Sequence, residues 1–447
     1  TVETKTRDGV WMVNLRPLEA GGPYVMNIVS KDTTITIQDV MVGEVWLCSG
    51  QSNMERQLGP RPPQKPIVNW EQEVQQANYP ALRQYAVPER YAAEMQTDAN
   101  GSWQVCSPET VPDFSAVAYF FARDLYNEIK IPVGILFAAY GGTPAEHWTN
   151  REALNSNPQL QELVSAYDKA VREYPDKLAQ YSQEAIPLYR QFLEDSAKAV
   201  ADSLPLPKRP APPADPQKGH MIGGLYNAMI HPLIPYAIKG VCWYQGESNN
   251  SRAGVYASLL TTLINNWRDE WHSGKFPFLI VQIAPHKDMS PQLREAQWDV
   301  VRDVPRTALI VTTDCGDSAD IHPAHKQPVG QRLAIAARAL AYRAHIEYSG
   351  PAYRKMIITG NEARIVFDHA HNGLTLKNGD SVLSGFQLAG LDHRFYPAQA
   401  RISHNAVILT SPKVRQAAEV RFGWENVPHV NLYNTEGLPA IPFRTDR

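Results

Sequence analysis

Residues 43–54 read GEVWLCSGQSNM, a short apolar run that stops in a tight polar turn. The length of this run fits a buried strand. Ser52 then stands just beyond the carboxyl end of that strand, where α/β folds bind ligands and place nucleophiles. The hydroxyl of Ser52 is therefore the first candidate for catalysis.

Two more polar clusters follow apolar, strand-like runs. They are Tyr244–Asn249, which reads YQGESN, and Asp320–Pro323, which reads DIHP. With Ser52 they supply a hydroxyl, amide donors, carboxylates and an imidazole. These groups together are what acyl transfer through a covalent serine ester requires.

Composition narrows the class of protein. The chain has 447 residues, more than one ordinary core holds, so about two or three domains are expected. With 43% hydrophobic and 20% charged residues it fits a globular protein rather than a disordered one. The net charge of -3, mixed along the chain, predicts no nucleic-acid or membrane partner. No apolar run reaches the roughly 18 residues that span a bilayer.

The start at Thr1, without a signal peptide, indicates a mature or truncated terminus.

Strand-like and helical segments alternate from about residue 42 to residue 347. This alternation predicts a doubly wound parallel sheet with right-handed crossovers. The candidate strands are Val45–Cys48, Gln84–Val87, Val133–Ala138, Gly240–Tyr244, Phe278–Ile283 and Ala308–Thr312. The candidate helices are Ser115–Ile129, about Arg252–Trp271 and Gln327–Ala344.

An insertion at about 150–217 interrupts this alternation. Its polar, helical segments Leu160–Tyr174 and about Pro175–Asp202, with a break near Pro187, predict a helical hairpin. The proline-rich stretch 204–213 that follows predicts a stiff extended return. Such an excursion can wall a substrate cleft or be a passive elaboration of the fold.

Both ends of the chain have β character. Residues 1–41 contain candidate strands at Val10–Leu15, Tyr24–Val29 and Thr33–Ile37, too few for a stable sheet alone. They are interpreted as part of an incomplete N-terminal β module. Residues 348–447 hold several short strands separated by turn residues, which predict a small C-terminal β-sandwich that the N-terminal strands can complete.

His322 is the candidate base for Ser52. Asp317 and Asp320 lie just upstream of it, and Pro323 fixes the turn after it. A carboxylate close in sequence can hold one imidazole nitrogen and leave the other for the serine. The ordinary alternatives are a turn serine that only caps the backbone and a surface histidine.

Other polar groups can complete such a site. Gln245 and Glu247 are two residues apart after a strand, so both can point into one cleft. Gln245 can donate to an oxyanion, and Glu247 can accept from His322 or orient a loop; both can equally just stabilise a turn. Gly142 follows the strand 133–138, where it can offer a backbone donor or form a tight turn.

A catalytic metal is not expected. Asp320, His322 and His325 can be read as ligands, but no helix aligns them. The four cysteines form no C-x-x-C pair, which argues against a zinc ribbon or a redox motif; they are Cys48, Cys106, Cys242 and Cys315.

Several sequence blocks in this order resemble the SGNH hydrolase superfamily, most closely its sialate O-acetylesterase and plant-polysaccharide acetylesterase branch. The resemblance covers nearly the whole chain. Its blocks are Gly50–Glu55, Gly141–Trp148, Trp243–Asn249, Asp320–Pro323 with Lys326, Gly330–Ala334, Asn431–Asn434, Gly437–Pro439 and Pro442-Phe443.

The resemblance implies a flavodoxin-like three-layer α/β sandwich and a Ser–His–acid esterase that needs neither metal nor cofactor. It makes Ser52 the nucleophile and His322 the base. It forms the oxyanion hole from the N–H of Ser52, the N–H of Gly142 and the amide of Gln245.

The acid departs from the usual pattern of this superfamily. Many SGNH enzymes carry it three residues before the histidine, where this chain has Ala319. Asp320 is the first choice, Glu247 the second, and Asp317 remains an alternative.

The function predicted is removal of O-acetyl groups from carbohydrates through an acetyl-Ser52 intermediate, most closely as in sialate O-acetylesterases. A xylan or xyloglucan acetylesterase is the alternative within enzymes. A non-catalytic carbohydrate-binding protein on an esterase scaffold is the alternative of another class. The resemblance further implies a periplasmic or secreted protein, or a lysosomal one in a eukaryote; the sequence predicts no oligomeric state.

Overall fold

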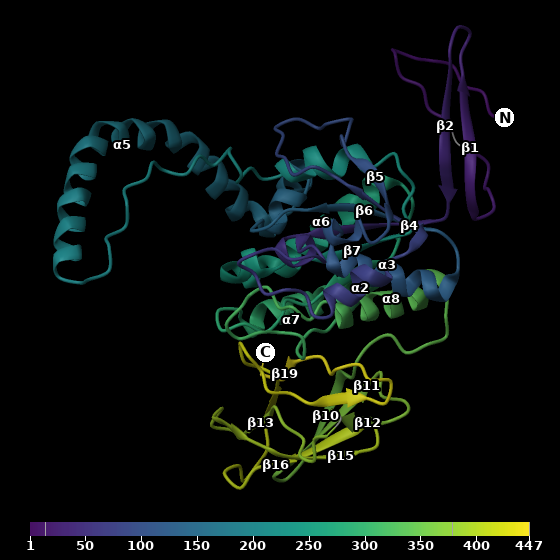
Figure 1. The fold of residues 1–447 in the computed structure, drawn as a ribbon. Helices are drawn as coiled ribbons and strands as arrows, with labels where there is room; N and C mark the ends of the chain where they lie inside the picture. Colours follow the sequence, from purple (N-terminus) through teal and green to yellow (C-terminus); the bar gives the residue numbers. More distant parts are fainter. Residues whose placement is uncertain (14, 378, 447) are drawn as a thin grey trace.

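A seven-stranded sheet forms the centre of the protein (Figure 1). The structure, a computed structural model, describes residues 1–13, 15–377 and 379–446. The strand order is β5-β4-β6-β3-β7-β8-β9, and every neighbouring pair is parallel except β4 and β5. The strands are β3 (Glu44–Gly50), β4 (Tyr79–Ala86), β5 (Ser102–Cys106), β6 (Val133–Ala139), β7 (Gly240–Tyr244), β8 (Phe278–Val281) and β9 (Thr307–Ile310).

Helices cover both faces of this sheet, as the alternating pattern predicts. Along β3, Leu47 belongs to the hydrophobic core on one face, whereas Trp46 and Cys48 belong to the core on the other. The first core includes residues of α6 (Ala253–Trp271) and α7 (Pro291–Asp303); the second includes residues of α3 (Ala116–Ile129) and α8 (Gln327–Tyr342). The three-layer α/β architecture is therefore confirmed.

The strand order decides where a site can form. The chain places β4, β5 and β6 on one side of β3 and β7, β8 and β9 on the other. The order therefore reverses at β3, and ligands bind beside the carboxyl ends of the strands at such a switch point. The ends of β3, β6 and β7 carry the motifs that the sequence singles out.

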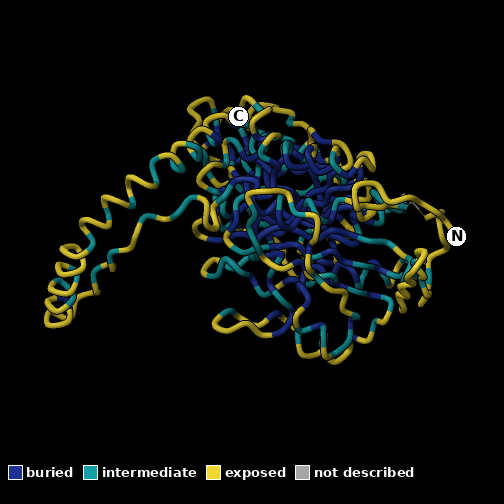
Figure 2. Tube along the Cα trace, turned by 90° about the horizontal axis from the view of Figure 1, so that it is seen from above, coloured by how far each residue is buried: buried dark blue, intermediate teal, exposed yellow. Residues whose placement is uncertain are grey.

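The insertion differs from the predicted helical hairpin. After α4 (Arg151–Ser156) the chain forms one long helix, α5 (Gln161–Ala201), with Pro175 and Pro187 inside it. A proline removes one backbone donor, and a helix can bend at that point instead of ending. Figure 1 shows α5 as a curved arm that projects from the sheet, and Figure 2 shows that most of the arm is exposed.

The C-terminal region is built from antiparallel sheets around its own core. The sheet orders are β10-β11-β16-β15, β14-β13-β17-β19 and β12-β18. Their strands are β10 (Ala352–Thr359), β11 (Glu362–Asp368), β12 (Leu374–Leu376), β13 (Phe386–Ala389), β14 (Phe395–Pro397), β15 (Gln399–Ser403), β16 (Ala406–Thr410), β17 (Glu419–Phe422), β18 (Leu432–Asn434) and β19 (Phe443–Arg444).

The N-terminal strands do not complete this C-terminal region. β1 (Gly21–Val29) and β2 (Thr34–Val42) form a hairpin, and within the described residues they pair only with each other. Figure 1 shows the hairpin at the far end of the molecule from the C-terminal sheets. In the first candidate strand, Val10–Leu15, Val10 makes an isolated bridge with Arg7 and the other described residues are irregular.

The remaining helices are short: α1 (Ser52–Glu55) and α2 (Trp70–Gln76) lie between β3 and β4. All four cysteines are buried and free. Among the helices in the described part of the chain, none combines the length and the apolar composition that crossing a bilayer requires.

Candidate active site

Ser52 stands where β3 ends and α1 begins. Gly50, two residues earlier, has a φ of 144°, and a Cβ there would meet the carbonyl oxygen of Tyr244 at 2.1 Å. Only glycine therefore lets the end of β3 close against β7. Because Ser52 is the first residue of the helix, its N–H has no partner within that helix.

Gln51 ties the nucleophile turn to the loop after β7. Its side-chain oxygen accepts from the backbone N–H of Gly246 at 3.4 Å and of Ser248 at 3.2 Å. Gln51 is 3% exposed, so these bonds lie in a buried environment. The residue before Ser52 thus fixes one side of the turn.

Asn53 fixes the other side and brings the histidine loop to the serine. Its amide nitrogen donates to Glu247 Oε1 at 2.6 Å and to the carbonyl of Ile321 at 3.0 Å. Asn53 follows Ser52 directly, and Ile321 directly precedes His322. The structure therefore joins the three predicted motifs around one buried amide.

His322 lies beside Asp320, the first candidate for the acid. Asp320 Oδ1 accepts from the backbone N–H of His322 at 2.9 Å and lies 3.8 Å from His322 Nδ1. Partial burial and the charge of Lys326 lower the pKa of His322, so the imidazole is neutral at neutral pH. Within the described residues no hydrogen bond joins His322 to Ser52; such bonds often tighten only when substrate binds.

The carboxylate of Asp317 bonds to groups other than His322. Its Oδ1 accepts from the backbone N–H of Ala319 at 3.0 Å and of Asp320 at 3.2 Å, and its Oδ2 pairs with Lys65. The bond to Lys65 lowers the pKa of Asp317. Asp317 therefore shapes the loop ahead of the histidine.

Backbone donors are available next to the serine. A Cβ built on Gly141 would lie 3.4 Å from Ser52 Cβ, so the loop after β6 lies against the nucleophile. Gly142 has a φ of 73° and open space where a side chain would be. In the described part of the chain no hydrogen bond uses the N–H of Ser52 or of Gly142. Both can donate to an oxyanion.

Gln245, the predicted side-chain donor of the oxyanion hole, is held by several hydrogen bonds. It is fully buried, and its amide nitrogen donates to the carbonyl of Thr143 at 3.2 Å and to Asn249 Oδ1 at 2.7 Å. Its oxygen accepts from the hydroxyl of Tyr256 at 2.8 Å. Both amide hydrogens of Gln245 are therefore in use, one of them on the loop after β6.

Glu247, the second candidate for the acid, contacts the nucleophile turn through Asn53. One of its oxygens accepts from Asn53, and the structure shows no hydrogen bond from His322 to Glu247 among the residues it describes. Glu247 is 8% exposed, and burial raises its pKa. Of its two predicted roles, the contacts fit orientation of a loop.

Two further residues of the site lie in or beside the quoted motifs but receive no role from the sequence. Lys326 is 1% exposed and donates from Nζ to Asn53 Oδ1 at 2.5 Å. Asn249 accepts from the N–H of Ala145 at 2.9 Å and donates to Glu146 Oε2 at 2.8 Å. Both lie inside or beside recognisable blocks, but their partners are far away in the chain, so periodicity alone does not reveal them.

Asp320, His322 and His325 can be read as metal ligands, although a catalytic metal is not expected. His325 is exposed, and within the described ranges no group of three or more His, Cys, Asp or Glu side chains is arranged to hold a metal ion.

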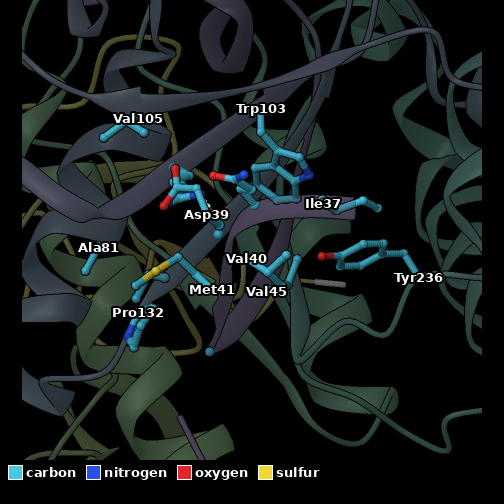
Figure 3. Close-up of a pocket in the computed structure, with 15 residues that line it drawn as sticks. Ile37, Asp39, Val40, Met41, Val45, Ala81, Trp103, Val105, Pro132 and Tyr236 are labelled. Atoms are coloured by element: carbon cyan, nitrogen blue, oxygen red, sulfur yellow. Dashed lines mark hydrogen bonds and ion pairs between the residues drawn. The ribbon is translucent and has the colours of Figure 1, made fainter. Parts of the chain in front are cut away.

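A groove lies at the other end of the strands. Figure 3 shows it between residues of β2, including Val40, and Trp103 and Tyr236. It is also lined by Val45 and Val133, near the amino ends of β3 and β6, so it opens away from Ser52.

Known proteins resemble this chain in sequence and in fold. Residues 217–339 match a family model described as a carbohydrate esterase, sialic acid-specific acetylesterase. Sialate O-acetylesterase from Rattus norvegicus is 31% identical over 98% of this chain and 84% of that protein. The human enzyme of the same name is 28% identical over 98% of this chain and 82% of its own length.

A solved structure of a carbohydrate acetylesterase also resembles this chain. The crystal structure of a novel carbohydrate acetylesterase from Xanthomonas citri superimposes with a TM-score of 0.78 at 34% identity, covering 96% of this chain and 86% of that chain. Identity at this level over almost the whole chain establishes the relationship: the chain belongs to the sialate O-acetylesterase family.

Proposed function

We propose that this protein is a serine esterase that removes O-acetyl groups from carbohydrates, with O-acetylated sialic acid as the first substrate class. The observation that carries the proposal is the link through Asn53, which joins the turn of Ser52 to the loop of His322. Membership of the family supports the same activity.

The proposed reaction proceeds through an acetyl-enzyme. Ser52 Oγ attacks the carbonyl carbon of the acetyl ester and gives its proton to His322 Nε2. The bond to the sugar oxygen then breaks, and this oxygen takes the proton from His322. Water, which loses a proton to the same imidazole, attacks the acetyl-serine, and acetate leaves as Ser52 regains its proton.

Asp320 is the acid of this proposal. It is the carboxylate that lies 3.8 Å from His322 Nδ1 and already holds the backbone of the same residue. A small rotation of either side chain when substrate binds brings the pair into hydrogen-bond range. Imidazolium formed during the reaction is then stabilised by the carboxylate.

The oxyanion is proposed to bind the N–H groups of Ser52 and Gly142. Both are without a hydrogen bond in the described residues, and the glycine loop lies against the serine. Preorganised donors of this kind contribute much of the rate enhancement in acyl transfer. Gln245 and Asn249 are proposed to hold the loop in this position.

The test is acetate release by the wild type and by Ser52→Ala. The substrates are O-acetylated sialic acid, acetylated xylan, acetylated xyloglucan and an aryl acetate; Ser273→Ala, in the loop after α6, is the control for serine loss. Release that depends on Ser52 supports the esterase and identifies its sugar. A Ser52→Ala variant with normal activity overturns the mechanism, and no release from any substrate favours the carbohydrate-binding alternative.

The family relationship also bears on location. We propose that the protein acts outside the cytoplasm, because the resemblance in its motifs is to esterases that are usually exported. Cell fractionation with an antibody tests this: recovery in the cytosolic fraction alone contradicts it.

A further inference from the structure

Two opposite charges are buried beside the proposed nucleophile without a direct ion pair. Lys326 is 1% exposed and Glu247 is 8% exposed. Within the described residues no salt bridge joins them; Asn53 bridges them instead, since its oxygen accepts from Lys326 at 2.5 Å and its nitrogen donates to Glu247 at 2.6 Å. We call these three residues the buried relay.

Such an arrangement is unfavourable for stability alone. Burying a charge is costly unless it is well paired, and well-packed apolar residues often stabilise a fold at least as well. The second oxygen of Glu247 is buried and has no hydrogen-bond partner among the described atoms. Burial lowers the pKa of Lys326 to about 7 and raises the pKa of Glu247. Titratable groups with perturbed pKa values cluster at functional sites.

The position of the relay indicates what it acts on. Asn53 directly follows Ser52, and its second amide hydrogen bonds the carbonyl before His322. All the hydrogen-bonding capacity of the Asn53 nitrogen is therefore used to join the nucleophile turn to the β7 loop and the histidine loop. Rotation of this amide would loosen both loops together.

Lys326 acts on His322 through space as well. Burial is the largest cause of the lowered pKa of His322, and the positive charge of Lys326 lowers this pKa further because it disfavours the imidazolium form. The other charged groups that act on His322 are Asp320, Arg61 and Glu55; those that act on Lys326 are Glu247, Arg56, Cys315 and Asp320. The aromatic ring of Tyr244 lies under the ammonium, 5.3 Å from Nζ to its centroid.

We propose that Lys326 is a positioning residue for the esterase reaction: held against Glu247 through Asn53, it fixes the amide that joins the loops of Ser52 and His322 and keeps the imidazole ready to accept a proton. This inference rests on the proposed function.

The experiment compares Lys326→Met, Glu247→Gln and the double variant with the wild type. Aryl acetate hydrolysis gives kcat and KM across the pH range, and thermal unfolding gives Tm. Lys65→Met is the matched control, because Lys65 is an exposed lysine that pairs with Asp317 in the same histidine loop.

The expected result distinguishes a role of Lys326 in positioning the reacting groups from a role in the stability of the fold. Each single variant leaves one buried charge uncompensated and lowers Tm, and the double variant recovers Tm because both charges are gone. In the double variant kcat stays roughly 10- to 100-fold below wild type with KM little changed, since misplaced reacting groups slow the chemical step. Lys326→Met moves the acidic limb of the kcat/KM profile to higher pH, because loss of the positive charge raises the pKa of His322.

Other results overturn the proposal. Recovery of both Tm and kcat in the double variant would mean that the relay has only a structural role. An unchanged acidic limb in folded Lys326→Met would mean that the charge of Lys326 does not affect the pKa of His322. If no variant folds, the wild type still decides: an acidic limb above the ordinary histidine value of 6.5 contradicts the proposal. Ser52→Ala is measured alongside. If Ser52→Ala is inactive while the relay variants behave like wild type, the proposed esterase activity is retained and only the role of Lys326 is contradicted.

Discussion

Two acids near His322 differ in what their oxygens already bind. Asp320 faces the histidine, with Oδ1 3.8 Å from Nδ1, whereas Asp317 accepts two backbone bonds and pairs with Lys65. Sequence spacing treats both as candidates, because both lie within five residues of the histidine. The hydrogen bonds of each carboxylate separate them.

Asp320→Asn should lower kcat/KM by roughly 10³- to 10⁴-fold, because the amide cannot stabilise the imidazolium and favours the wrong tautomer. Asp317→Asn, the matched control, should stay within a few-fold of wild type. Steady-state kinetics on an aryl acetate measures both variants. Equal losses in the two variants would contradict the assignment.

The acidic limb of the pH profile reports on His322. The residue must be neutral to accept the proton of Ser52, and burial followed by the charge of Lys326 lowers its pKa below the ordinary 6.5. As pH falls, the midpoint of the activity loss should therefore lie below pH 6.5. The measurement is kcat/KM for the wild type in overlapping buffers. A midpoint above 6.5 would be inconsistent with this environment.

At the scale of elements, the contact between β3 and β7 places the nucleophile turn. Ladder partners run from Trp46 opposite Gly240 to Gly50 opposite Tyr244. The last pair requires glycine, because a side chain on Gly50 would collide with backbone. The apolar run of β3 predicts the strand, but only the neighbouring strand explains the glycine.

Gly50→Ala should destabilise the protein by about 1–3 kcal/mol through this collision, with further loss from the strained φ. Gly254→Ala, in the first turn of α6 with no atom within 4 Å of the new Cβ, should be neutral or stabilising by up to about 1 kcal/mol. Urea unfolding of the two variants gives the comparison. Similar stability for the two variants would show that the backbone of β7 can shift to make room for the new Cβ.

At the scale of the whole molecule, the C-terminal sheets attach to the catalytic domain through α7 and the loop after β9. Arg294 of α7 is 1% exposed and donates to the carbonyls of Glu425 and, at 3.3 Å, Asn426. Tyr433 donates to Asp314 at 3.1 Å, in the loop that leads to the histidine. The β region thus supports the same loop that carries the proposed base.

Arg294→Ala should lower stability by about 1–3 kcal/mol, since the carbonyls of Glu425 and Asn426 lose the charged donor that ties them to α7. Arg302→Ala is the control on the same helix; its side chain is 47% exposed and its ion pairs lie at the surface, so a change within about 0.5 kcal/mol is expected. Thermal unfolding followed by tryptophan fluorescence measures both. A normal Tm for Arg294→Ala would mean that other contacts hold the two regions together.

Local patterns in the sequence predicted most of the central fold. β7 has the bounds predicted for it, and α3, α6 and α8 begin or end within a few residues of theirs, because apolar runs and helical stripes are short-range signals. The edge strand β5 and the helix α7 were not predicted.

Local patterns also placed Ser52 directly after a strand and His322 in the segment that follows another strand. They did not reveal that α5 continues through two prolines, since a bend or a break satisfies the same local chemistry.

Only the tertiary structure decided how the polar groups of the site are divided among their tasks. Gln245 uses both amide hydrogens on partners in its own loop and in the loop after β6, and within the described residues the N–H groups of Ser52 and Gly142, which we propose as oxyanion donors, make no hydrogen bond. Asn53, Glu247 and Lys326 are far apart in the chain and meet only when the strands pack. A hydrogen bond depends on distance and direction in space, so residue type and spacing named the available groups, whereas packing of the sheet selected which of them touch.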